Sequence, residues 1–326
     1  MNARIGPPAG EESSMSEESE ILNPIYEHLQ AVEMDGGLIK EERFLQRLEA
    51  VERLEHHVIE GIETLRHGNT SARELAALRR RADEVLARLR AVDRSMWDRV
   101  REEIRSGRLR GEALAQRMAQ YAGQGPVHSW RQDPVGYDAL DDYLSGLFRV
   151  DMVPHETRRR DSEMVFYQPT PSRIVLALVV RGRVTAEDRF YDLGSGLGQV
   201  CIITGLLSDA RVTGIEYEPT FCEYARRSAE GLGADNVDFV NADVREAYLE
   251  DGTFFFMYTP FWGSILREVL DRLMRISRDH PIRLGTYGPC TDIVSSENWL
   301  RPVRWRGQDL GIDGMDGPAI WESKPW

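Results

Sequence analysis

Apolar residues recur at helical spacing through the first third of the chain. They follow three- and four-residue intervals between Lys40 and His67, and they resume at the same intervals from Leu75 to Met96. Gly68-Asn69 interrupts the pattern, and Ser71 with Glu74 forms a capping box that restarts a helix. Because a short turn joins two such segments, the pattern predicts an antiparallel helical hairpin.

The segments around this hairpin differ in composition. Residues 1–20 are acidic and poor in apolar side chains, which predicts a disordered acidic tail. A helical region is expected over 21–122, with Pro24 opening its first short helix, and a linker followed by one helix is expected over 123–150. The helical region is interpreted as an arm for a homodimer or a substrate lid, or alternatively as an extension packed on the next domain.

The pattern changes after about residue 150. Short β-rich runs now alternate with helical runs, from Arg189–Leu193 to Ile282–Tyr287, and this alternation is typical of a parallel sheet covered on both faces. Val303–Arg306 and Ile320–Glu322 are expected to pair as an antiparallel hairpin at the sheet edge. We therefore predict an α/β fold over 151–326, a doubly wound, seven-stranded and mostly parallel sheet preceded by the α-helical region.

Composition and charge narrow the functional classes. With 41% hydrophobic residues, the 326-residue chain has enough apolar material for a core, which excludes global disorder. The longest aliphatic run, Ile174–Val180, is far shorter than the roughly 20 residues of a membrane span, and the N-terminal residues lack the apolar stretch of a secretory signal. The net charge of −13 disfavours nucleic-acid binding. The three cysteines lack the spacing of a zinc site, so we expect a cytoplasmic protein with reduced thiols, no metal and no membrane association.

A glycine-rich turn after the first predicted strand carries the strongest chemical signal. Asp192 ends the strand, Gly194, Gly196 and Gly198 follow, and a helix begins at about Gln199. Such a turn lets a ligand approach the backbone at a helix N-terminus. The spacing differs from the G-x-G-x-x-G of dinucleotide sites, because Gln199 stands where the third glycine would fall. A carboxylate before the turn suits a cationic ligand and repels a pyrophosphate, which favours S-adenosylmethionine over NAD.

Two further acidic residues follow the next two predicted strands. Glu216 ends the second strand, where a carboxylate accepts hydrogen bonds from ribose hydroxyls in other nucleotide-binding units. Asp243 follows the third strand and would accept from an adenine amino group, with the N–H of Val244 facing the ring. Three acids at the ends of successive strands strengthen the prediction of a nucleoside-bearing cofactor.

These residues resemble the class I S-adenosylmethionine-dependent methyltransferases over about residues 165–326. The resemblance implies that Asp192 and the turn containing Gly194, Ser195, Gly196, Gly198 and Gln199 hold the methionine end of the cofactor. It also implies that Glu216 holds the ribose, and that Asp243 and Val244 hold the adenine.

A narrower similarity links the glycine turn to histone lysine methyltransferases of the disruptor-of-telomeric-silencing type. That family has a Tyr- and Thr-containing loop before its glycine turn, and Phe166-Tyr167-Gln168-Pro169-Thr170 occupies this place here. By this similarity Tyr167 and Thr170 would contact the cofactor. The sequence departs from the family after the fourth strand, where Tyr258-Thr259-Pro260-Phe261 replaces Asn-Asn-Phe.

The loop beginning at Tyr258 is expected to face the transferred methyl group. It is interpreted as an aromatic wall that aligns the acceptor, or alternatively as a buried apolar turn. Methyl transfer needs a base only where the acceptor must lose a proton. The candidates for such a base are Tyr258 and Tyr287, and His280 and Tyr167 are considered as well. The predicted function is methyl transfer from S-adenosylmethionine to an unidentified small molecule. A protein-lysine methyltransferase and a non-catalytic cofactor-binding assembly protein are the alternatives.

Overall fold

The structure is a computed structural model that describes residues 9–66, 70–124, 136–149, 153–305 and 317–325. The chain divides into two compact units, Met1–Trp97 and Asp98–Trp326. The division falls inside one helix, α4 (Ala72–Arg105), whereas the sequence placed the end of the helical region at residue 122. Beyond Trp97 this helix belongs to the second unit, because the guanidinium of Arg101 donates to the carbonyls of Gly146 (2.7 Å) and Leu147 (3.0 Å).

The first unit begins with a helix where a disordered tail was predicted. α1 runs from Ala9 to Met34, so residues 9–20 are helical and Pro24 lies inside the helix rather than at its start. Pro24 cannot donate the usual backbone hydrogen bond, which weakens a helix locally. The apolar face nevertheless continues across it, since Ile21 packs against the core before it and Ile25 and Leu29 are buried after it. Packing of this face accounts for the continuous helix.

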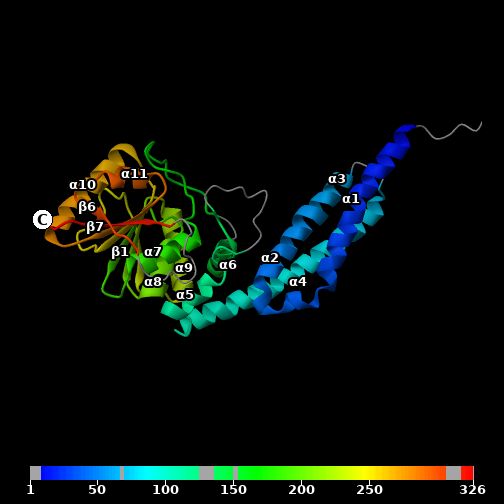
Figure 1. The fold of residues 1–326 in the computed structure, drawn as a ribbon, viewed down its shortest axis with the longest axis horizontal. Helices are drawn as coiled ribbons and strands as arrows, with labels where there is room; N and C mark the ends of the chain where they lie inside the picture. The colour runs from blue at the N-terminus through cyan, green and yellow to red at the C-terminus, as the bar shows by residue number, and fades with distance from the viewer. Residues whose placement is uncertain (1–8, 67–69, 125–135, 150–152, 306–316, 326) are drawn as a thin grey trace, which may run out of the picture. The chain divides into compact units, whose positions relative to one another are not determined.

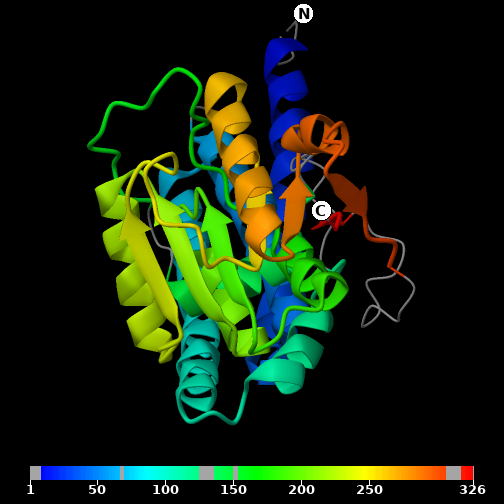
Figure 2. The same cartoon turned by 90° about the vertical axis from the view of Figure 1, so that its left-hand side faces the viewer.

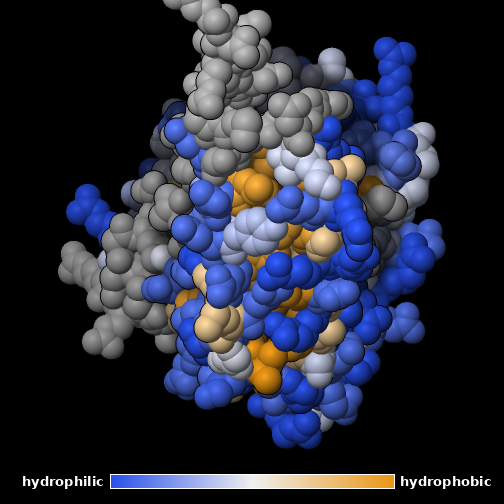
Figure 3. Space-filling view, turned by 90° about the vertical axis from the view of Figure 1, so that its right-hand side faces the viewer, coloured by the Kyte–Doolittle hydropathy of each residue, from blue (hydrophilic) through white to orange (hydrophobic). Residues whose placement is uncertain are grey.

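Three short elements and two α-helices complete the first arm of the hairpin: η1 (Gly36–Ile39), η2 (Glu41–Arg43), α2 (Phe44–Glu52), η3 (Arg53–Ile59) and α3 (Glu60–Leu65). Their ion pairs with α4 run in opposite directions along the two arms, linking Arg47 to Asp93, Glu55 to Arg90 and Glu63 to Arg79. The hairpin is therefore antiparallel, as predicted. In the face drawn in Figure 3, apolar side chains show only in narrow patches between charged ones, as expected of amphipathic helices. The proposed homodimer through the hairpin stays a prediction.

The second unit contains the predicted sheet. Its strands are β1 (Arg189–Leu193), β2 (Arg211–Glu216), β3 (Val237–Asn241), β4 (Phe254–Tyr258), β5 (Arg283–Tyr287), β6 (Leu300–Pro302) and β7 (Ala319–Ser323). Their order is β3-β2-β1-β4-β5-β7-β6. β7 runs antiparallel to both of its neighbours, β5 and β6, and the other pairs are parallel. This confirms the seven-stranded, mostly parallel, Rossmann-like fold. The strand order reverses between β1 and β4, where such sheets open a crevice at their carboxyl ends.

Helices cover both faces of the sheet: α5 (Gly111–Ala119), α6 (Ala139–Phe148), α7 (Ser172–Gly182), α8 (Gln199–Ser208), α9 (Pro219–Leu232), α10 (Gly263–Asp279) and α11 (Cys290–Ser295). Figure 1 shows α7, α8 and α9 on one side of the strands and α10 and α11 on the other. Alternate strand residues serve the two faces. Tyr191, Leu193 and Phe255, for example, share a buried cluster with the apolar side of α10. Burial on both faces is why the strands read as nearly continuous apolar runs.

Three sequence predictions about the connections can be compared with the described residues. The helix expected before the sheet is α6, which Asp138 caps through the N–H of Leu140 at 2.9 Å. Most of the predicted linker before it lies outside the described residues. The expected edge hairpin forms between β6 and β7, so its first strand begins at Leu300 rather than at Val303. Among the helices of the described residues, none has the length and apolar character that a membrane crossing requires.

Candidate active site

The glycine turn after β1 depends on the absence of side chains at two positions. Gly194 and Gly196 have positive φ angles of 94° and 53°. A Cβ at Gly194 would lie 2.4 Å from the Cβ of Pro260, and one at Gly196 would lie 2.5 Å from Cε2 of Tyr167. The N–H of Gly194 is held by the carbonyl of Ile215 at 2.9 Å, which ties the turn to β2. Glycine is therefore required here by both conformation and space.

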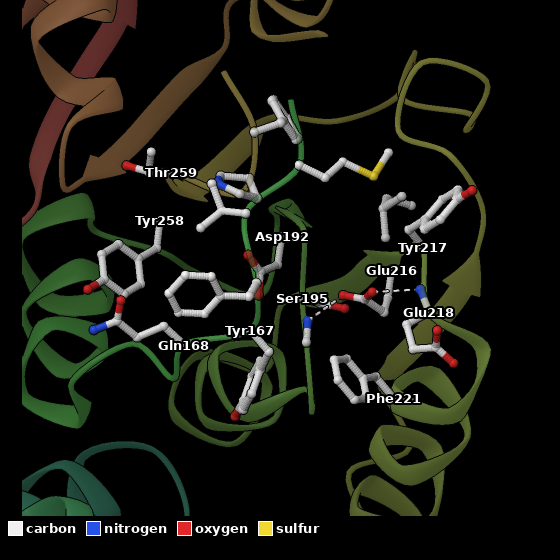
Figure 4. A pocket seen from close by; sticks show the side chains of 18 of the residues that line it. Tyr167, Gln168, Asp192, Ser195, Glu216, Tyr217, Glu218, Phe221, Tyr258 and Thr259 are labelled. Carbon is white, nitrogen blue, oxygen red and sulfur yellow. Dashed lines mark hydrogen bonds between the residues drawn. The ribbon is translucent and has the colours of Figure 1, made fainter. Parts of the chain in front are cut away.

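A cavity of about 370 Å³ opens over this turn at the carboxyl ends of β1, β2 and β4 (Figure 4). Its volume lies within the range of small-molecule and cofactor pockets. The structure brings together most of the predicted site residues in its lining, namely Tyr167, Thr170, Asp192, Gly194, Ser195, Gly196, Gln199, Glu216, Val244 and Tyr258.

Asp192 is a buried carboxyl group at the floor of the cavity. The thiol of Cys201 donates to its Oδ2 at 3.6 Å, and no other hydrogen bond to this carboxylate is found among the described residues. Burial raises the pKa of Asp192 to about 7, and the neighbouring Glu216 carboxylate adds to the rise. A cationic hydrogen-bond donor in the cavity would therefore stabilise the ionised form.

Glu216 joins the end of β2 to the glycine turn. Its Oε2 accepts the N–H of Gly196 at 2.7 Å, and its Oε1 accepts the N–H of Glu218 at 2.7 Å (Figure 4). These bonds fix both oxygens while leaving each a further lone pair. Burial raises the pKa of Glu216, although the two backbone hydrogen bonds oppose that shift. The carboxylate is thus placed to accept two hydroxyl hydrogen bonds from the cavity.

Four of the predicted site residues do not line the cavity. Gly198 caps α8, and a Cβ there would lie 2.5 Å from the ring of Phe239. Asp243 pairs with the guanidinium of Arg245 at 2.6 and 2.9 Å, and these hydrogen bonds hold the pKa of Asp243 below its usual value. Its contact with adenine stays a prediction. Tyr287 is the third, and its ring packs against that of Tyr258. His280 is the fourth, and its Nε2 lies 3.0 Å from the carbonyl oxygen of Gly252.

The opposite side of the cavity from Glu216 is aromatic. Figure 4 shows Tyr258 and Gln168 side by side there. The ring of Tyr258 lies 5.1 Å from that of Tyr287, so the second tyrosine supports the first. Thr259 adopts a positive φ of 41°, and its hydroxyl donates to the carbonyl of Tyr287 at 3.1 Å and accepts the N–H of Cys290 at 3.1 Å. These bonds hold the loop that presents Tyr258 to the cavity.

Residues 156–168 line much of the cavity, and sequence reasoning placed Tyr167 there but missed Glu156, Met164 and Val165. In Figure 2 this segment runs above the carboxyl ends of the strands. Glu218 fixes its start by accepting the N–H groups of Thr157 and Arg158, both at 2.9 Å. The N–H of Val165 donates to the carbonyl of Pro260 at 2.9 Å and fixes its end. The signal for its anchored start lies elsewhere in the sequence, at Glu218-Pro219, a helix cap followed by proline at the first helical position.

The lining fits S-adenosylmethionine by its chemistry. The buried Asp192 suits the ammonium group of the methionine part, and the remaining lone pairs of Glu216 suit two ribose hydroxyls. Gly194 and Gly196 let the ligand lie directly on the backbone. The apolar side chains of Val244 and Phe261 supply a surface for a flat aromatic base. The cofactor would supply a methyl group on a positively charged sulfur.

Comparisons with known proteins agree with this chemistry. Residues 190–279 match a family model described as a methyltransferase domain. No curated protein sequence matches the chain. Among solved structures, it is similar to an RNA methyltransferase from Salinibacter ruber in complex with S-adenosyl-L-homocysteine, with 25% identity, a TM-score of 0.38 and coverage of 48% of this chain and 94% of that one.

Two further solved structures show a comparable likeness. One is a precorrin-6y C5,15-methyltransferase from Geobacter metallireducens, with 19% identity, a TM-score of 0.37 and coverage of 51% of this chain and 95% of that one. The other is an S-adenosylmethionine-dependent methyltransferase from Geobacter sulfurreducens in complex with S-adenosyl-L-homocysteine, with 26% identity, a TM-score of 0.30 and coverage of 36% and 48%. The matched methyltransferase domain supports a methyltransferase, and it implies S-adenosylmethionine as the cofactor of this protein.

Proposed function

We propose that the protein transfers the methyl group of S-adenosylmethionine to a small-molecule acceptor held beside Tyr258. The observation that carries this proposal is the cavity over the glycine turn, in which Asp192 and Glu216 lie across from Tyr258 and Gln168 (Figure 4). The first pair suits the cofactor, and the second pair forms a separate wall with room for an acceptor. Residues 156–168 line the same cavity, which favours an acceptor small enough to be enclosed.

The residues act by binding, orientation and exclusion of water. Asp192 accepts a hydrogen bond from the ammonium group, and Glu216 accepts hydrogen bonds from the ribose hydroxyls. The glycine turn lets the ligand lie directly against the protein backbone. Tyr258 forms an aromatic wall that orients the acceptor in line with the methyl group and favours nearby positive charge. The 156–168 segment keeps water from the reacting atoms.

Apart from tyrosines, which include the candidate base Tyr258, the described lining offers no obvious general base. Its described residues include no histidine, and its carboxylates are already engaged: Glu218 by Thr157 and Arg158, and Glu156 by Arg160 at 2.8 Å. Asp192 and Glu216 serve the cofactor in this proposal. The site therefore suits an acceptor atom that is nucleophilic without protein help, such as a neutral amine or a thiolate.

The decisive experiment follows label from tritiated S-adenosylmethionine in a dialysed cell lysate. The small-molecule fraction is added back to one half, and the Gly196→Val variant, checked for folding by circular dichroism, is the control. We expect transfer by the wild-type protein only where the small molecules are restored. Label in protease-sensitive material without them would contradict the small-molecule proposal.

A protein acceptor is the second candidate, because exposed apolar side chains stand close to the cavity. Phe166 lines the cavity and is 63% exposed. Trp262 is 53% exposed, and its backbone N–H donates to the carbonyl of Glu163 in the same segment. Exposed apolar groups beside a site are typical of a surface that meets another macromolecule. Under this alternative, Trp262→Ser would reduce transfer to protein acceptors while leaving the affinity for S-adenosylhomocysteine unchanged.

A further inference from the structure

Hydrogen bonds connect the start of α6 to the cavity through a buried serine. Nε2 of Gln199 donates to Oγ of Ser172 at 2.7 Å, and that hydroxyl donates to Oδ1 of Asp141 at 2.8 Å. Ser172 is completely buried at the first position of α7, whereas Gln199 lines the cavity at the first position of α8. Three helices thus meet through three side chains.

The direction of these bonds follows from the proton each group can supply. The carboxylate of Asp141 accepts three times: from the N–H and the hydroxyl of Ser172 at Oδ1, and from the N–H of Asp138 at Oδ2, each at 2.8 Å. A carboxylate has no hydrogen to give, so Ser172 must use its only hydroxyl hydrogen on Asp141. The serine oxygen can then only accept, and Gln199 must present its NH₂ group to it.

This sequence of donors determines which end of the Gln199 amide remains for a ligand. With Nε2 bound to Ser172, the carbonyl oxygen Oε1 lies at the other end of the amide, and it has no hydrogen-bond partner among the described residues. In the proposed function, the group that complements a free amide oxygen is the ammonium group that Asp192 attracts. Asp192 supplies the charge, and a correctly turned amide oxygen supplies a second acceptor with a defined direction.

We propose that Asp141 and Ser172 are positioning residues that hold the Gln199 amide with its oxygen toward the ammonium group of the cofactor. The inference rests on the proposed function and deepens it, because it adds two positioning side chains, Asp141 and Ser172, that lie outside the matched residues 190–279. It also explains the glutamine at the position where a dinucleotide fingerprint has glycine. A glycine there has no amide to orient.

The test compares two ligands that differ only at this end of the molecule. S-adenosylhomocysteine carries the ammonium group, whereas 5′-methylthioadenosine keeps the adenosine and lacks the amino-acid part. Ser172→Ala removes the acceptor for Gln199 but leaves the N–H of residue 172 bonded to Asp141. By calorimetry we expect the affinity for S-adenosylhomocysteine to fall about 3- to 10-fold and that for 5′-methylthioadenosine to stay unchanged.

Two further variants complete the design. Ser208→Ala is the matched control, because its hydroxyl donates to the carbonyl of Thr204 at the opposite end of α8, and it should alter neither affinity. Gln199→Ala should lower the affinity for S-adenosylhomocysteine about 10-fold or more. The double variant with Ser172→Ala should bind no more weakly than Gln199→Ala alone, because both changes remove the same contact. Gln199 is only partly buried, so its replacement tests the proposal even if Ser172→Ala fails to fold.

The outcomes separate the inference from the function on which it rests. Equal losses for both ligands, or no loss for S-adenosylhomocysteine, would overturn the positioning role while leaving the cofactor site intact. Additive losses in the double variant would also overturn it. Failure of the wild-type protein to bind S-adenosylhomocysteine at all would overturn the proposed function, and the inference with it.

Discussion

The N–H of Gly196 donates to Oε2 of Glu216 at 2.7 Å, so one hydrogen bond joins the glycine turn to the end of the neighbouring strand. Glu216→Gln would replace one of its two acceptor oxygens with a donor facing a backbone N–H. We expect the affinity for S-adenosylhomocysteine to fall roughly 10- to 100-fold and the free energy of unfolding to fall by about 1–3 kcal/mol. Calorimetry and urea unfolding measure the two effects. Glu223→Gln, on the exposed side of α9, should change neither, and an unaltered affinity in Glu216→Gln would contradict the ribose assignment.

Gly196 itself should tolerate no side chain. In Gly196→Ala the new Cβ would lie 2.5 Å from the ring of Tyr167, which lines the cavity, and the residue would keep a φ of 53°. The ring must then move, and we expect binding of S-adenosylhomocysteine to be lost. Gly231→Ala in α9 is the control, because nothing lies within 4 Å of its added Cβ. That change should stabilise the protein by up to about 1 kcal/mol without altering binding. Normal binding by folded Gly196→Ala would exclude the turn as the ligand site.

Asp192 should make the stability of the ligand-free protein depend on pH. Its pKa of about 7 lies above the ordinary value of 3.8, so the folded state binds more protons than the unfolded state between these pH values. The contribution of this group to stability is therefore complete below pH 4 and decreases as the pH rises to 7. In Asp192→Asn we expect that decrease to disappear, which would raise the free energy of unfolding at pH 8 by up to about 4 kcal/mol relative to wild type.

The same substitution should weaken the cofactor site. A cationic ammonium group needs the ionised carboxylate, so the affinity of the wild-type protein for S-adenosylhomocysteine should increase as the pH rises through about 7. Asp192→Asn should bind weakly at every pH. Melting curves and binding isotherms from pH 5 to 8 measure both effects. A variant that lost affinity without gaining stability would show that Asp192 is not held protonated by burial.

Glu218 should hold the start of the 156–168 segment. Burial alone would raise its pKa, but hydrogen bonds from Arg158, Thr157 and Thr220 outweigh this and lower the pKa of Glu218 to about 2. The contribution of ionised Glu218 to the free energy of unfolding is present above the ordinary pKa near 4.5 and is lost as the pH falls toward 2. In Glu218→Gln we expect faster hydrogen exchange at Thr157 and Arg158 at pH 7, measured by mass spectrometry. Unchanged exchange at these two amides would contradict this anchoring role.

A buried ion pair should contribute far more to the helical hairpin than an exposed one. Arg47 is fully buried and donates to Asp93 at 2.7 Å, whereas Arg79 and Asp83 pair in solvent on α4. Asp93→Asn leaves a buried guanidinium without its counter-charge, and we expect the free energy of unfolding to fall by about 3–5 kcal/mol. Asp83→Asn should cost less than about 1 kcal/mol. Similar melting temperatures for the two variants would contradict the packing of the hairpin.

The sheet and the glycine turn could be predicted because their signals are local. Asp192 and the three glycines lie within seven consecutive residues, and the strands differ from the helices in period and length. Apart from Tyr167, the 156–168 segment could not be predicted in the same way. Its position depends on Glu218 and Pro260, which are distant in sequence, and it has no periodicity of its own.

Asp243 shows where reasoning from strand ends reaches its limit. The sequence correctly places it after β3, but the direction of its side chain depends on Arg245, two residues away. The division within α4 shows the same limit on a larger scale. Apolar spacing continues through Trp97, so nothing in the periodicity marks where one packed unit gives way to the next. Contacts such as that of Arg101 with Gly146 determine the division.

The order of β6 and β7 in the sheet has a consequence for synthesis on the ribosome. β7 lies between β5 and β6, although it follows β6 in the chain. Until β7 has emerged, β5 presents an open edge and β6 has no strand to pair with, so the nascent domain carries an unprotected sheet edge through a late stage of translation. A nascent chain that has emerged only to a point between residues 302 and 319 would therefore display a nearly complete cofactor site and an edge open to aggregation. Pairing of β7 with β5 and β6 closes that edge.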